Sequence, residues 1–359
     1  MWSIENCRTE VLGGHVDVCL ACADRTPSYN SCRNRHCPKC QSLKQAAWLD
    51  KRKERILATN YFHVVFTLPS ELRQICRHNP RDLYNLLFKS ASQTLIDFGR
   101  GELSAQLAIT AVLHTWTRDL RLHPHVHCVV TGGGLDDNDQ WVAASKRFLF
   151  SIKAMGKRFR GKFLDGLRAL HADGKLILDD DLADDRTFCG LVDSLYRKDW
   201  VVYAKPPFGG PEQVFTYLGR YTHRVAISNH RLVHVDEHEV RFRTRDGQHD
   251  SLGPEKFIGR FLLHLLPSAF VKIRHYGLWA SCNSARLEKA RAALSAQSQS
   301  AAVIAVPAAT RIVEEPLDWR ELFLALTGID LAVCPRCGGQ RVRYRLTKVM
   351  PPRKAHDTS

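Results

Sequence analysis

Paired cysteines near the N-terminus restrict the fold of this chain more than any other feature. Six of the twelve cysteines lie within the first forty of its 359 residues. Cys19 and Cys22 form one CxxC knuckle, Cys37 and Cys40 form another, and fourteen residues separate the two. Each knuckle presents two thiolates from a tight turn, and two knuckles can close a tetrahedron around zinc. The sequence therefore predicts a small structural zinc module with these four ligands.

Other residues of the same region could hold a second zinc, although single Cys and His residues are more often simply buried or on the surface. Its candidate ligands comprise a CxxxH pair and two further side chains: Cys32, His36, Cys7 and His15. A closed four-ligand site has no open coordination position, so the module is expected to fold and bind rather than to catalyse. Nearby basic residues are candidate DNA contacts, namely Arg33, Arg35 and Lys39. A solvated basic helix over residues 41–59 explains the local charge equally well.

The charge balance is consistent with a nucleic-acid partner. The 52 Lys and Arg residues against 37 Asp and Glu give a net charge of +15, which attracts polyanions. No apolar run approaches the 18 residues of a membrane span, and the first residues lack the features of a secretory signal. We expect a cytoplasmic protein without a membrane partner.

Hydrophobic periodicity predicts an α+β core. Apolar and β-branched runs predict strands, and apolar residues at helical spacing predict helices. The predicted strands are 61–69, 107–116, 125–131 and 200–204, and the predicted helices are 81–98, 153–170 and 185–196. We expect a mostly antiparallel sheet with helices on one face and the active side chains on the other.

Further elements follow towards the C-terminus. Pro211 and Glu212 mark the start of a helix, short strands are expected at 225–227, 231–235 and 239–244, and another helix begins at Pro254. A third knuckle, Cys334 and Cys337, is half a zinc site. The predicted organisation is a zinc module over 1–58, a catalytic domain over 59–293, a linker over 294–317 and a C-terminal tail over 318–359.

A histidine triplet at alternate positions suggests a catalytic metal site. Within a strand, His125 and His127 point to one face while Val126 and Cys128 point into the core. Two imidazoles on one face can hold a divalent metal that polarises a phosphate. Taken alone, the pair is more typical of polar residues on an exposed strand. The third ligand stays open among three candidates: His123, His114 and His223.

A pair of tyrosines about ninety residues later suggests nucleophiles. Tyr217 and Tyr221 are four residues apart, so a helix places them on one face. A phenolate attacks phosphate when cationic groups stabilise it. Candidate phosphate contacts nearby are Arg220, Arg224 and Lys205. Tyrosines at this spacing usually serve packing, so the interpretation depends on the histidines.

Together these motifs resemble a known family. The stretches YNSCRNRHCPKCQ at 29–41, FHVVFTLP at 62–69, HPHVHCVVTGGG at 123–134, YLGRYTHR at 217–224 and RHYG at 274–277 are similar to HUH-type, two-tyrosine transposases of the IS91 insertion-sequence family. The resemblance runs from about Cys7 to Trp279.

The resemblance implies both a fold and a reaction. It implies that His125-Val126-His127 is the HUH motif, that Tyr217 and Tyr221 are the nucleophiles, and that the core is RRM-like or ferredoxin-like. Such an enzyme is expected to nick and rejoin single-stranded DNA at element ends with Mg²⁺ or Mn²⁺. It would form a 5′-phosphotyrosine intermediate and drive rolling-circle transposition.

Two other interpretations use the same residues. One is a plasmid replication initiator or relaxase of the HUH class, although the zinc module and the RHYG stretch favour the transposase. The other is a non-catalytic, zinc-dependent DNA-binding protein. Which tyrosine acts first, the DNA sequences recognised and the oligomeric state do not follow from the sequence.

Overall fold

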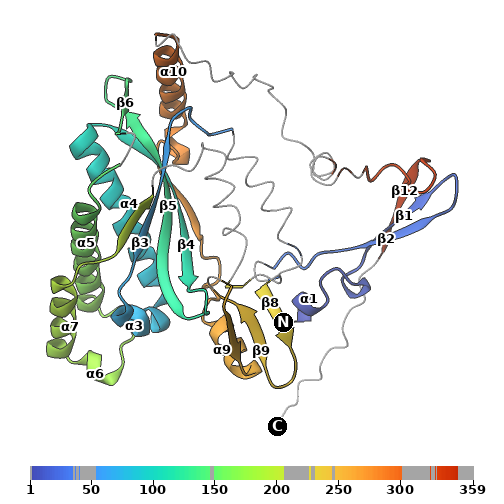
Figure 1. The fold of residues 1–359 in the computed structure, drawn as a ribbon, viewed down its shortest axis with the longest axis horizontal. Coiled ribbons are helices and arrows are strands. Elements are labelled where there is room, and N and C mark those ends of the chain that lie inside the picture. The colour runs from blue at the N-terminus through green and yellow to red at the C-terminus, as the bar shows by residue number, and fades with distance from the viewer. Residues whose placement is uncertain are drawn as a thin grey trace. The chain divides into compact units, whose positions relative to one another are not determined.

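The computed structural model divides the chain into two compact units (Figure 1). The terminal unit combines Met1–Lys51 with Val306–Ser359, and the central unit is Arg52–Ala305. The structure describes residues 2–34, 37, 40, 54–145, 149–205, 226–227, 231–244, 247–300, 324, 328 and 330–346. The C-terminal segment thus belongs with the N-terminal cysteines, whereas the sequence predicted a separate tail at 318–359.

A six-stranded antiparallel sheet forms the centre of the central unit. Its strands follow the order β11-β4-β5-β3-β7, and β6 pairs with β5 at one end. The bounds are β3 Tyr61–Thr67, β4 Gln106–Trp116, β5 Leu122–Leu135, β6 Trp141–Ala143, β7 Val202–Lys205 and β11 Ile273–Gly277. The antiparallel sheet that the sequence predicted is confirmed, but β5 continues through Gly132, where the prediction ended it.

Helices cover one face of this sheet. Along β3, Phe62, Val64 and Phe66 are fully buried in a core that also includes residues of α4, α5 and α7. Figure 1 shows these three helices on the same side of the sheet. The helical bounds are α3 Arg73–His78, α4 Pro80–Leu103, α5 Ile152–Ala172, α6 Asp180–Ala183 and α7 Asp185–Arg197, with a short 3-10 turn at Ser70–Leu72. The α+β architecture of the prediction is therefore confirmed.

A small second sheet lies within the central unit. Its order is β10-β9-β8, and α9 packs against it through Phe257 and Phe261. Phe242 of β9 is fully buried at this contact. The bounds are β8 Leu232–Val235, β9 Val240–Arg243, β10 His249–Leu252 and α9 Pro254–Leu262.

The RHYG stretch forms the edge strand β11 beside β4. Gly277 ends it with a φ of 61°, and a Cβ there would lie 1.8 Å from the carbonyl oxygen of Leu107. Only glycine permits so close an approach of two backbones. After a 3-10 turn at Ser281–Asn283, α10 runs over Ser284–Ser300, so the first residues of the predicted linker are helical.

The terminal unit contains a three-stranded antiparallel sheet in the order β12-β1-β2. Asp17 of β1 is buried and accepts two hydrogen bonds from the Arg343 guanidinium directly opposite it on β12, at 2.6 and 3.0 Å. The elements are α1 Trp2–Glu5, a 3-10 turn at Glu10–Leu12, β1 Gly14–Cys19, β2 Arg25–Tyr29 and β12 Arg341–Leu346. Strands from the two ends of the sequence thus form one sheet.

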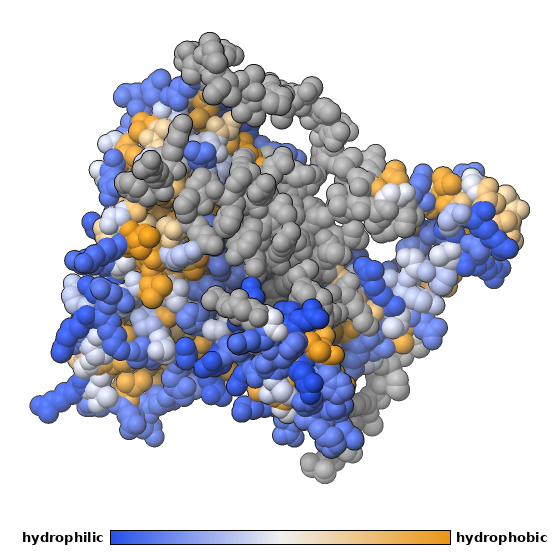
Figure 2. Space-filling view, viewed as in Figure 1, coloured by the Kyte–Doolittle hydropathy of each residue, from blue (hydrophilic) through white to orange (hydrophobic). Residues whose placement is uncertain are grey.

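The surface agrees with the charged composition. On the face shown in Figure 2, the described residues are mainly hydrophilic, with separate hydrophobic patches. Among the residues described, no helix combines the length and apolar character needed to cross a membrane.

Candidate metal centre and cysteine clusters

The register of β4 against β5 brings three histidines together. His114 lies directly opposite His125, and His127 follows two residues further along β5. Opposed residues of an antiparallel pair share a face, as do alternate residues of one strand. The ligand atoms of all three imidazoles lie within 4.8 Å of one another. This separation suits ligands of a single ion.

The rest of β5 explains why the cluster faces away from the helices. Val126 and Cys128 are fully buried in the core on the helical face, as the alternation predicts. His114 is buried, whereas His125 and His127 are half-buried. The sheet therefore holds the three rings on the face opposite the main hydrophobic core.

Hydrogen bonds at Nδ1 fix two of the rings. His125 donates from Nδ1 to the carbonyl oxygen of His123 at 2.6 Å. His127 Nδ1 lies 2.8 Å from Nε2 of His63 on β3, and the two rings stack at 5.0 Å. When Nδ1 is the donor, Nε2 carries the lone pair that a metal requires. His125 is therefore oriented as metal-binding histidines usually are, and so is His127 in the tautomer whose Nδ1 donates to His63.

Burial keeps the cluster neutral. Desolvation lowers the pKa of His125 to about 4. The pKa of His127 lies well below its usual value because of burial and then the charges of His125 and His63. Burial likewise depresses the pKa of His114, followed by the effects of His127 and His125. Imidazole binds a metal only when neutral, so this environment favours ligation at neutral pH.

The geometry distinguishes among the three candidates for the third ligand of the catalytic metal. His114 is the candidate that joins His125 and His127. His123 has its ring centroid 5.4 Å from that of His125 but is not part of the cluster, and His223 lies outside the described residues. Sequence reasoning missed His63, although FHVVF on β3 alternates in the same manner as HPHVH on β5.

The predicted nucleophiles and most of their phosphate contacts fall outside the part of the chain that the structure describes. These residues are Tyr217, Tyr221, Arg220 and Arg224. Lys205 is the last residue of β7 and lies opposite His63 in the strand register. The backbone of Lys205 therefore lies on β7, the strand that pairs with β3 on the side opposite β5.

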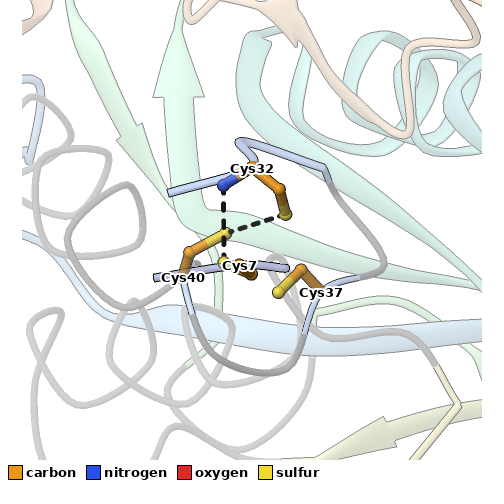
Figure 3. Close-up of side chains that lie close together, drawn as sticks. All are labelled: Cys7, Cys32, Cys37 and Cys40. Carbon is orange, nitrogen blue, oxygen red and sulfur yellow. Dashed lines mark hydrogen bonds between the residues drawn. The ribbon is translucent and has the colours of Figure 1, made fainter. Parts of the chain in front are cut away.

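Four cysteines of the terminal unit meet in a first cluster, Cys7, Cys32, Cys37 and Cys40 (Figure 3). The backbone amide of Cys32 donates to the Cys7 sulfur at 3.4 Å, and the Cys32 and Cys40 sulfurs lie 3.8 Å apart. Cys7, Cys37 and Cys40 are buried. Four convergent thiols with amide donors around them are typical of a structural zinc site.

A second cluster joins distant parts of the sequence, and its members are Cys19, Cys22, Cys334 and Cys337. The predicted ligand set of Cys19, Cys22, Cys37 and Cys40 is therefore divided between the two clusters. Proximity in the sequence suggested that neighbouring knuckles pair, but the turn after β1 meets the turn before β12 instead. The C-terminal knuckle, which the sequence predicted as half a zinc site, lies together with Cys19 and Cys22.

Of the remaining predicted ligands, His15 is described by the structure and does not enter either cluster. His15 on β1 lies 3.9 Å from the Asp17 carboxylate, and its burial lowers its pKa. Arg33 is exposed. Three others lie beyond the described residues, namely His36, Arg35 and Lys39.

Comparison with known proteins gives the family. Residues 108–286 match a family described as "Putative transposase", and residues 1–68 match the "Transposase zinc-binding domain" of IS91 elements. Over its full length the chain is 42% identical to "Putative transposase y4qJ" of Sinorhizobium fredii, covering 92% of that protein. The chain belongs to the IS91 transposase family. As a transposase it is a DNA-processing enzyme, and DNA is its partner.

Two further similarities to this transposase are weaker. It is 28% identical to the "Transposase for insertion sequence element IS801" of Pseudomonas savastanoi pv. phaseolicola over 77% of this chain and 68% of that protein. A metal-bound structure of the conjugative relaxase TrwC with oriT DNA shares 12% identity over 66% of this chain and 71% of that one, at a TM-score of 0.26. That score is too low to support a shared fold.

The family matches divide the candidate sites between them. The zinc-binding match contains the whole first cysteine cluster but only Cys19 and Cys22 of the second. The transposase match contains the histidine cluster and the two predicted tyrosines. The expected zinc is thus supported by the family and by the cysteine clusters together.

Proposed function

We propose that this transposase nicks and rejoins single-stranded DNA at insertion-sequence ends through a 5′-phosphotyrosine intermediate. The observation that carries the proposal is the convergence of His114, His125 and His127 within 4.8 Å on one face of the sheet. The antiparallel sheet with helices on the other face is compatible with an RRM-like HUH core. In this proposal the cysteine-containing terminal unit binds the DNA.

The histidine cluster fits a divalent cation. Its imidazoles are neutral at physiological pH, and hydrogen bonds at Nδ1 orient two of them. Imidazole is a preferred ligand of zinc, copper, iron and nickel, whereas Mg²⁺ and Mn²⁺ prefer oxygen ligands, so water and phosphate oxygens would complete the coordination of either ion. A bound Mg²⁺ or Mn²⁺ would polarise the scissile phosphate and offset the charge that develops on it.

Tyr217 or Tyr221 is proposed as the attacking group. Its phenolic oxygen forms a bond to phosphorus while the bond from phosphorus to the 3′ oxygen breaks, which leaves a free 3′-OH. The new ester keeps the energy of the phosphodiester, so rejoining requires no nucleotide hydrolysis. The second tyrosine makes the second cut.

Cationic side chains are proposed to hold the DNA backbone. In the central unit these are Lys205, Arg220 and Arg224, and in the terminal unit Arg33, Arg35 and Lys39. Each phosphate contact releases counterions, so the affinity for DNA should fall steeply as salt rises. The net charge of +15 supports such a contact surface.

A covalent-adduct assay tests the proposal. The full chain is incubated with labelled single-stranded oligonucleotides from the element ends plus Mg²⁺ or Mn²⁺, and products are resolved on a denaturing gel. We expect a protein–DNA adduct that the double change Tyr217→Phe and Tyr221→Phe abolishes. Tyr196→Phe, which changes an exposed tyrosine on α7, is the matched control and should leave the adduct intact.

Histidine variants separate chemistry from binding. His125→Ala with His127→Ala should abolish the adduct while affinity for the same oligonucleotide stays within about twofold. Adducts that persist in the tyrosine double variant would overturn the nucleophile assignment. Loss of DNA binding in the histidine double variant would instead indicate a structural role for the cluster.

A further inference from the structure

We propose that Cys19, Cys22, Cys334 and Cys337 bind a second structural zinc, which fastens the C-terminal segment to the N-terminal strands. This site is distinct from the first cysteine cluster and shares no ligand with it. It lies entirely within the terminal unit. Two of its four ligands lie far beyond the matched zinc-binding domain.

The four sulfurs are placed as a tetrathiolate site requires. Cys19 and Cys337 have their sulfurs 3.4 Å apart, and those of Cys22 and Cys334 are 3.8 Å apart. All four lie within 4.8 Å of one another, a separation that zinc–sulfur bonds of about 2.3 Å can span. These cysteines are not disulfide-bonded, and a disulfide requires a sulfur separation of about 2.05 Å.

Both pairs come from tight turns at the same end of one sheet. Cys19 ends β1, and the turn towards β2 is closed by hydrogen bonds from the amides of Ala23 to the Cys19 carbonyl and of Cys19 to the Asp24 carbonyl. The C-terminal turn is closed by the Gly338 amide donating to the Cys334 carbonyl. Each turn therefore presents its two thiols towards the other.

Glycine permits the close approach of the two turns. Gly338 has a φ of 75°, in the left-handed region. A Cβ at Gly339 would lie 2.8 Å from the Cβ of Ala21, 3.2 Å from the Cys19 sulfur and 3.3 Å from the Cys337 sulfur. A larger residue at this position would push the two knuckles apart.

Contacts independent of the sulfurs support the same pairing. β12 forms a continuous ladder with β1, and the paired hydrogen bonds between Asp17 and Arg343 lie within it. Next to the knuckles, the Arg341 guanidinium donates to Asp24 at 3.0 Å. Because these contacts set the strand register, the backbone itself carries the two cysteine pairs to one place.

Thiol reactivity in the unmodified protein provides the first test. Cys22 and Cys337 are exposed, as are Cys189 and Cys282, which belong to neither cluster. In zinc-loaded, full-length protein under reducing conditions, N-ethylmaleimide should label Cys189 and Cys282 at once. It should label Cys22 and Cys337 at least tenfold more slowly until a chelator is added, as peptide mass mapping would show. Equal rates at all four would overturn the proposal.

Metal content provides the second test, in a background with His125→Ala and His127→Ala so that only thiol sites are counted. We expect two zinc ions per chain by elemental analysis, and one after Cys334→Ser with Cys337→Ser. Cys7→Ser with Cys32→Ser should remove the other zinc, whereas the control Cys189→Ser with Cys282→Ser should remove neither. Undiminished zinc in the Cys334 and Cys337 double variant would overturn the proposal. So would a non-reduced mass showing disulfides among these four cysteines in a zinc-free chain.

Discussion

The terminal and central units are ordered by different means. The central unit buries a large apolar core between its sheet and the helices α4, α5 and α7. In the terminal unit the described core cluster consists of Cys7, Cys37 and Cys40 with Ile4 and Cys32 packed beside it. Strand register and hydrogen bonds at Nδ1 preorganise the histidine cluster, whereas cysteines make up most of the buried cluster in the described part of the terminal unit. A metal should therefore add to the stability of the central unit, which folds without it, but should be required to hold the terminal unit together.

Removing metal from the whole protein should produce the largest difference between the units. A structural zinc contributes on the order of 10 kcal/mol to small domains, because the ligands come together to bind it only in the folded chain. We expect a chelator to abolish hydrogen-exchange protection in β1 and β12 while β3, β4 and β5 stay protected. Readdition of zinc under reducing conditions is the control and should restore the lost protection. Simultaneous loss in both units would contradict the comparison.

Phe159→Ala should produce the opposite pattern. Phe159 is fully buried, with its ring 5.0 Å from Phe66 and 5.4 Å from Trp200. Loss of such a ring costs about 3–5 kcal/mol through transfer and cavity terms. Chemical denaturation should show this loss for the central unit, while the zinc content per chain stays unchanged. A fall in zinc content would mean that the two units do not fold independently.

Acid should destabilise the central unit through His264. Its ring is buried beside the Leu120 carbonyl, and burial lowers its pKa from 6.5 to about 4. The unfolded chain binds more protons between these values, so stability falls as pH drops from about 6.5 to about 4. The loss contributed by His264 should approach about 3 kcal/mol at pH 4.

Denaturation of His264→Gln at several pH values checks the size of this effect. The variant should lose less stability than the unaltered protein over the same range. His78→Gln, on α3, is the matched control and should follow the unaltered protein. A parallel decline in all three would contradict the assignment to His264.

His63→Ala should have a smaller effect, confined to the histidine cluster. His63 orients the His127 ring through the Nε2···Nδ1 contact of 2.8 Å, and loss of such a partner typically weakens metal affinity about 10- to 100-fold. Calorimetric titration with Mn²⁺ measures the change. His63→Gln retains a side-chain oxygen that accepts from Nδ1, so it should recover part of the affinity. Equal losses in both variants would indicate packing rather than orientation.

Much of the central unit could be predicted from local patterns. Strands at 61–69 and 107–116 and helices at 153–170 and 185–196 follow from periodicity, which short segments carry themselves. β5 extended beyond Gly132 because its glycines fit where β6 and β4 come close: a Cβ at Gly134 would lie 2.6 Å from the Gln106 carbonyl oxygen. The contact between Gly134 and Gln106 is a tertiary one, so the residues around the glycines do not predict it.

The metal sites could be predicted only in part. Alternation in β5 gives His125 and His127 a common face, but selecting His114 requires the register between two strands. The cysteine partners were harder still, since Cys22 and Cys334 are 312 residues apart. Spacing identifies a knuckle, whereas tertiary structure decides which knuckles meet.

The pairing of β1 with β12 also affects the order in which the protein forms during synthesis. Asp17 leaves the ribosome 326 residues before its partner Arg343. At a synthesis rate of about 5–20 residues per second, β12 is made roughly 15–65 s after β1. The central unit can fold within that interval. The terminal unit is completed last although its synthesis begins first, so a polypeptide interrupted before β12 would carry a folded core and an unfinished terminal unit.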